Sequence, residues 1–88
     1  MNRIIDNKGN YAIKGTVQVY EKDKSGSALQ LCLQTDEFEK YIIENSTEYE
    51  ELFSLIGKKL LIFGEKLILE HTTVAYIRIK SYKTLNSI

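Results

Sequence analysis

Residue types that commonly carry catalysis or bind metals are few in this chain and lie far apart. The chain has one histidine, His71, and one cysteine, Cys32. His71 has no second histidine or cysteine beside it to complete a zinc site. Cys32 has no nearby histidine in the sequence that would activate a thiolate. We therefore expect no metal site, no cofactor and no catalytic residue, and we interpret the protein as non-enzymatic.

Adjacent carboxylates are the other chemically suggestive feature. They occur at Asp36 with Glu37 and at Glu50 with Glu51. In a turn and on a helix surface such pairs are ordinarily solvated charge, so we assign them no acid-base role. Neither a P-loop, a dinucleotide-binding glycine pattern nor a Ser-His-Asp arrangement can be assembled from the sequence.

Basic and aromatic residues alternate near the end of the chain. Because successive side chains of a strand point to opposite faces, the alternation predicts one shared face for them. Such a face could contact a polyanion, but Lys and Arg on an exposed strand also protect it from aggregation, so both interpretations stay open. This basic-aromatic stripe consists of Tyr76, Arg78, Lys80 and Tyr82.

Overall charge gives no reason to expect a basic protein. Twelve Lys and Arg residues balance twelve Asp and Glu residues, so the formal net charge is zero. The charges are unevenly placed, because residues 36–51 contain one basic and seven acidic side chains. We therefore predict an acidic pole and a more basic remainder.

Length and composition limit the architecture. Eighty-eight residues suffice for one domain with one modest core, here residues 1–88. A single cysteine excludes an internal disulfide, which fits a reducing compartment. The first ten residues have no apolar signal-peptide core, and no apolar run approaches the roughly 18 residues of a membrane span. We expect a cytoplasmic protein without membrane contact.

Hydrophobic alternation predicts five strands, at residues 12–21, 28–34, 40–45, 60–69 and 74–82. A polar loop with Gly26 separates the first two. Glycines within strands often mark bends, as we expect at Gly15 and Gly64. The residues predicted to face inward are Ile13, Gly15, Val17, Val19, Leu29, Leu31, Leu33, Tyr41, Ile43, Leu60, Ile62, Ile77 and Ile79, with Val17, Leu31, Ile62 and Ile77 at the centre of the core.

A single helix is predicted over residues 47–56, between the third and fourth strands. Thr47 and Glu50 match a capping box, and Gly57 follows as a left-handed stop. The expected buried stripe, at helical spacing, is Tyr49, Leu52, Phe53 and Ile56.

Three strands, a helix and two strands form the order of the oligonucleotide/oligosaccharide-binding (OB) fold, a five-stranded Greek-key barrel. The chain resembles that superfamily over residues 11–83, through Gly15 in KGTVQV and Gly57, Lys58 and Gly64 in LIGKKLLIFG. Residues 1–10 would then be an N-terminal arm and residues 84–88 a tail. These features are architectural and identify no particular family.

The resemblance implies a ligand lying across the second and third strands, between the loops at residues 22–27 and 70–73. Single-stranded DNA or RNA, bound weakly, is the leading expectation. The sequence departs from strong nucleic-acid binders, because only one aromatic residue, Tyr20, lies near this face and an acidic segment borders it. The candidate ligand face consists of Tyr20, Lys22, Lys24, Gln30, Gln34, Lys40 and Ile42.

Leu61 and Phe63 indicate a different function. If Leu60 and Ile62 fill the barrel, these two apolar side chains point out of it. We predict that they are covered by the N-terminal arm, by the tail or by a second copy of the chain. The alternative to nucleic-acid binding is therefore a protein-interaction or assembly module that uses the outer face of the last two strands.

Overall fold

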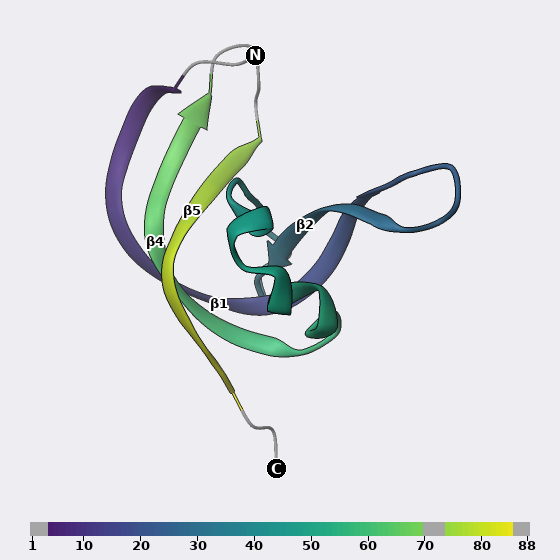
Figure 1. Ribbon diagram of the computed structural model, residues 1–88. Coiled ribbons are helices and arrows are strands. Elements are labelled where there is room, and N and C mark those ends of the chain that lie inside the picture. Colours follow the sequence, from purple (N-terminus) through teal and green to yellow (C-terminus); the bar gives the residue numbers. More distant parts are fainter. Residues whose placement is uncertain (1–3, 70–73, 86–88) are drawn as a thin grey trace.

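The structure is a computed structural model that describes residues 4–69 and 74–85, without the side chains of residues 4–9, 68 and 69. It is an all-β barrel in which five strands curl around one core (Figure 1). The strands are β1 (Ile4–Lys22), β2 (Ala28–Gln34), β3 (Lys40–Ile43), β4 (Lys59–Leu69) and β5 (Ala75–Thr84).

The strands pair in the order β1-β2-β3-β5-β4, and β1 closes the barrel by pairing with β4. All pairs are antiparallel except β3 with β5, which is parallel. This confirms the predicted five-stranded Greek-key barrel and is consistent with an OB-like fold.

Strand phases are mostly as predicted. Val17, Leu31, Ile62 and Ile77 are completely buried in one hydrophobic cluster. Leu29 is an exception, because it was predicted inward and is exposed. Register shifts on either side of the Glu21–Gln30 pair explain the error. They leave Leu29 without a partner position, and a bulge of this kind interrupts the period of two on which the prediction depended.

The N-terminal arm is not separate from the barrel. β1 begins at Ile4, so residues 4–10 form the first part of that strand and pair with residues 65–69 of β4. A side chain at Gly64 would collide with the carbonyl oxygen of Arg78, and one at Gly15 would lie 2.5 Å from the carbonyl oxygen of Gln34. The two glycines therefore permit close backbone approach where the long strands curve.

The predicted α-helix over residues 47–56 is absent. In its place are two 3-10 turns, η1 (Ser46–Glu48) and η2 (Glu50–Ser54), separated by Tyr49 at φ −133° and ψ 64°. Neither turn has a side-chain cap, so the predicted capping box does not form. Gly57, at φ 89°, does adopt the predicted left-handed conformation, but it follows a 3-10 turn.

Tertiary hydrogen bonds hold this segment to β5. Buried Asn45 holds both backbone groups of Ile79, donating to its oxygen at 3.0 Å and accepting from its nitrogen at 2.8 Å. The Tyr49 hydroxyl donates to the Lys80 oxygen at 3.1 Å. The segment is thus attached to β5 at two points four residues apart.

The change of helix type also changes the buried face. A 3-10 helix repeats every three residues, so Tyr49, Leu52 and Leu55 align and pack on the barrel core. Ile56, predicted to be buried, is exposed. Phe53 is partly buried, as a residue beside this face should be.

Candidate functional site

Two buried apolar side chains lie in the middle of the outer face of β2 and β3. Cys32 and Ile42 are paired neighbours in register, and only 1% and 2% of their surfaces are exposed. Burial raises the pKa of the Cys32 thiol, which makes it a poor nucleophile. Ile42 was predicted to be part of the candidate ligand face, but its side chain has almost no exposed area with which to contact a ligand.

The β1–β2 hairpin projects from the barrel (Figure 1). Its turn is organised by Asp23, whose Oδ1 accepts hydrogen bonds from the Ser25 and Ser27 backbone nitrogens, both at 2.9 Å, and from the Ser25 hydroxyl at 2.7 Å. The Ser25 hydroxyl bond, followed by the backbone bonds, lowers the pKa of Asp23. Gly26 completes the turn at φ 91°. The hairpin tip thus has a defined conformation.

Four candidate residues on the hairpin and on β3 are solvent-accessible. Tyr20 occupies a register shift in β1 and is 45% exposed. Lys22, Lys24 and Lys40 are exposed, and the described part of the chain gives none of them an ion pair. These residues therefore combine one available aromatic ring with three available cations.

The two candidate glutamines are less available. Gln30 is half-buried, and its amide nitrogen donates to the Ile43 backbone oxygen at 3.0 Å across the sheet. Gln34 is also half-buried, between Thr16 and Lys40 in register. Gln30 thus supports the joining of β2 and β3, and Gln34 presents only part of its amide.

The basic side chains of the stripe are paired within the protein. Arg78 Nε lies 2.8 Å from Glu44 Oε2, and this hydrogen-bonded pair raises the pKa of Arg78. Lys80 Nζ lies 3.1 Å from Glu65 Oε1. Both cations would have to give up a carboxylate before they could bind phosphate.

The prediction that Tyr82 faces outward with Tyr76 is wrong. Between the Phe63–Ser81 and Gly64–Ile79 pairs, Lys80 has no partner position in β4, which reverses the alternation beyond it. Tyr82 packs on the core, with its ring 6.1 Å from the Tyr49 ring. Its hydroxyl bonds Glu51 Oε1 at 3.0 Å. The four stripe residues therefore do not form one surface.

Leu61 and Phe63 lie on the outer side of β4, as predicted. Phe63 is 39% exposed and pairs in register with Ala12 and Ser81, whose small side chains leave its ring accessible. Leu61 is half-buried. Residues 4–10 and the C-terminal strand run beside β4 in register, so their backbones do not cross this pair.

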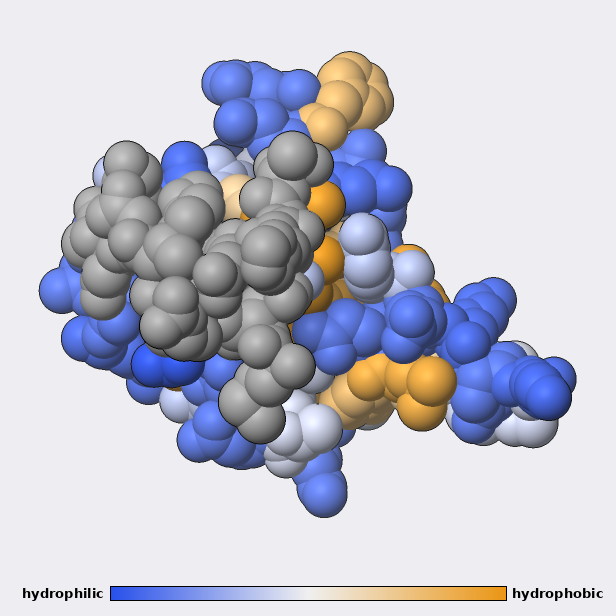
Figure 2. Space-filling model, turned by 90° about the horizontal axis from the view of Figure 1, so that it is seen from above, coloured by the Kyte–Doolittle hydropathy of each residue, from blue (hydrophilic) through white to orange (hydrophobic). Residues whose placement is uncertain are grey.

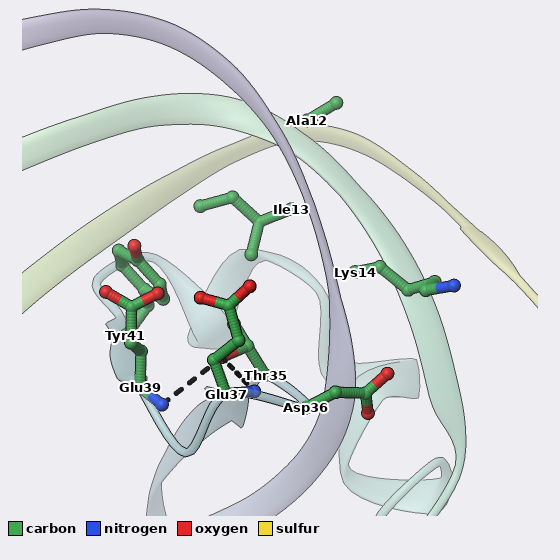
Figure 3. A pocket seen from close by; sticks show the side chains of 8 residues that line it. All are labelled: Ala12, Ile13, Lys14, Thr35, Asp36, Glu37, Glu39 and Tyr41. Atoms are coloured by element: carbon green, nitrogen blue, oxygen red, sulfur yellow. Dashed lines mark hydrogen bonds between the residues drawn. The ribbon is translucent and has the colours of Figure 1, made fainter.

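A cavity of about 320 Å³ lies between β1 and the β2–β3 turn, and no pattern in the sequence indicated it. In Figure 3, Glu37 and Glu39 extend on the side of Ile13 and Tyr41, whereas Lys14 and Asp36 extend on the opposite side. Its wall combines residues from β1 with a turn that only folding brings near. The lining residues are Ala12, Ile13, Lys14, Thr35, Asp36, Glu37, Glu39 and Tyr41.

Some predicted features lie outside the described residues, namely His71 and the loop at residues 70–73. Within the described ranges no cluster of His, Cys, Asp and Glu is arranged to hold a metal ion. Those ranges also contain no helix with the length and apolarity needed to cross a membrane.

Comparisons of the chain with protein-family models, with curated proteins and with solved structures found no match. The arrangement of side chains on the barrel is therefore the basis for any functional interpretation.

Proposed function

We propose that this protein is a non-enzymatic binding module that contacts single-stranded nucleic acid weakly through the β1–β2 hairpin and the adjoining face of β2 and β3. The observation that carries the proposal is the combination of half-exposed Tyr20 with Lys22, Lys24 and Lys40, none of which has an ion pair among the described residues. An aromatic ring can stack on a base, and lysines can contact the phosphates on either side of it.

The same surface explains why the binding should be weak and tolerant of sequence. Cys32 and Ile42 are buried, so a base would lie on the surface of the strands without entering a pocket. Gln30 uses its amide nitrogen within the sheet, which leaves few groups to read base edges. Glu21 and Asp23 lie among the hairpin lysines and reduce the local positive potential.

Fluorescence anisotropy with labelled 12-nucleotide DNA and RNA at 50 and 200 mM salt tests the proposal. Three phosphate contacts to a single strand predict roughly a 20-fold loss of affinity between the two salt concentrations. Tyr20→Ala should weaken binding by about 1 to 3 kcal/mol, the usual contribution of one stacked base. Phe38→Ala, which removes an exposed aromatic residue from another turn, is the matched control. Absence of binding at 50 mM salt would contradict the proposal.

A second candidate function, self-association, is favoured by Phe63. The ring is 39% exposed on the outer face of β4, and β4 pairs on both sides with β1 and β5, so a second copy would contact this strand through its side chains. Phe63→Asp should convert a dimer to a monomer in sedimentation velocity, whereas Tyr20→Ala should not. Weak dimers form at a concentration of about 100 µM. A wild-type protein that is still monomeric at that concentration would eliminate this candidate.

A further inference from the structure

We infer that the cavity between β1 and the β2–β3 turn is a binding site for an arginine side chain of a partner protein. It is separate from the proposed nucleic-acid surface, because it shares no residue with the hairpin or with Lys40. Its acidic lining would also repel phosphate.

Charge is unbalanced inside the cavity. Asp36 is paired with Lys59, at 3.6 Å between Oδ1 and Nζ, but the described residues give neither Glu37 nor Glu39 an ion pair. Figure 3 shows both carboxylates on one side of the cavity, whereas Lys14 extends on the other. Two neighbouring carboxylates repel each other and favour a cation between or beside them.

Tyr41 is only 8% exposed and lines the cavity. Its hydroxyl makes no hydrogen bond among the described residues and is not a buried polar atom, so it keeps contact with solvent and is available to a ligand. The ring already attracts a cation of this chain, because Lys66 Nζ lies 5.4 Å from its centre. Lys66 does not line the cavity, so a ligand there would meet the tyrosine from another direction.

The turn that carries the carboxylates has a defined conformation. The Thr35 hydroxyl accepts hydrogen bonds from the backbone nitrogens of Glu37 at 3.3 Å and Glu39 at 3.2 Å. The Thr35 nitrogen donates to the Glu39 oxygen at 2.9 Å, and the Phe38 nitrogen donates to the Thr35 oxygen at 3.0 Å. The short loop that carries the two carboxylates is therefore already ordered, so binding of a ligand does not have to order it.

These features select guanidinium over ammonium. A planar guanidinium can bond two carboxylates and stack on an aromatic ring, whereas ammonium is a point charge with stronger hydration. Phe38, on the same turn but outside the cavity, is available for an apolar contact with a partner. Its side chain is 82% exposed and therefore contributes nothing to the core. Its φ of 65° is a backbone conformation that a bulky residue seldom adopts.

The test is a titration of ¹⁵N-labelled protein with the peptide Ac-Gly-Arg-Leu-NH₂, followed by NMR chemical shifts. We expect saturable shifts at Ile13 and at residues 35–41. The peptide with citrulline, a neutral isostere of arginine, should bind roughly 10-fold more weakly, as should Glu37→Gln/Glu39→Gln protein with the arginine peptide. The lysine peptide should be intermediate.

Glu48→Gln/Glu50→Gln is the matched control, because it removes the same charge from exposed positions outside the cavity. It should bind as the wild type does. Equal affinity for the arginine and citrulline peptides, or equal losses in the two double variants, would overturn the inference. If Glu37→Gln/Glu39→Gln protein does not fold, the comparison of the two peptides on wild-type protein still decides the question. Nucleic-acid binding is measured separately, so either proposal can fail alone.

Discussion

Single residues in this protein connect parts of the chain that are distant in sequence. Asn45 is the clearest case, because its amide satisfies both backbone groups of Ile79 within the barrel. Tyr82 performs a related task through its bond to Glu51 and its edge contact with Tyr49. Both residues tie the segment between β3 and β4 to β5, so their loss should be felt in stability.

Asn45→Ala should destabilise the protein by about 2 to 4 kcal/mol. It leaves the Ile79 N–H without its acceptor and the Ile79 C=O with only the 3.4 Å hydrogen bond from the Tyr49 hydroxyl, and each unsatisfied group costs about 1 to 3 kcal/mol. Asn45→Asp keeps an acceptor for the N–H and should fold better at low pH, where the carboxyl can also donate. Urea unfolding monitored by circular dichroism provides the measurement. Equal stability of wild type and Asn45→Ala would show that the hydrogen bonds contribute nothing.

Tyr82 should make stability depend on alkaline pH. Burial, followed by the hydrogen bond to Glu51, raises its pKa in the folded state. The folded state therefore holds the phenolic proton more tightly, so this stabilisation is complete below the unfolded pKa of about 10 and is lost as pH rises through the higher folded value. The stability difference between wild type and Tyr82→Phe, measured by urea unfolding, should shrink from pH 8 to pH 11. A difference that grows over this range would contradict the assignment.

At the scale of elements, two long strands and their interruptions shape the barrel. β1 pairs with β4 through its first part and with β2 through its last part, whereas β4 pairs with β1 and β5 along the same length. At Gly64 the backbone of β5 lies so close that a side chain would collide with the Arg78 carbonyl oxygen. The strand register shifts at Tyr20, Leu29 and Lys80. Each shift changes the face of the sheet to which the following side chains point. The interrupted strands thus decide which apolar and aromatic groups reach the surface.

Gly64→Ala should destabilise the barrel by about 1 to 3 kcal/mol or more. The added methyl group would meet the Arg78 carbonyl, which is backbone and cannot rotate away. Gly26→Ala is the comparison, because it introduces no contact and only the strain of a positive φ. Thermal unfolding should give Gly64→Ala a clearly lower unfolding temperature than Gly26→Ala. The reverse order would mean that β4 and β5 can move apart without loss of stability.

The whole molecule combines zero net charge with a closed barrel. On the face seen in Figure 2 the described surface is mostly hydrophilic, and apolar side chains emerge in separate places. Closure of the barrel leaves β4 paired on both sides, and we expect binding to use the hairpin, a side-chain face or the cavity. The single core beneath these surfaces supplies most of the stability.

Leu31→Ala should cost about 2 to 5 kcal/mol, because Leu31 is completely buried and a cavity would remain. That is a large part of the roughly 5 to 15 kcal/mol that stabilises a small domain. Leu29→Ala, two positions away and exposed, should change stability by less than about 1 kcal/mol. Chemical denaturation of the two variants tests the strand phase, and similar losses would show that it is wrong.

The sequence by itself determined the strand order and most inward positions, because a strand repeats every two residues and each pattern is local. It also indicated the bends at Gly15 and Gly64 and the left-handed Gly57. Only tertiary structure decided the rest. The bulges and the ion pairs of Arg78 and Lys80 depend on which strands become neighbours, as do the cavity and the choice of 3-10 turns over a helix. These contacts join residues far apart in the chain, which local periodicity does not encode.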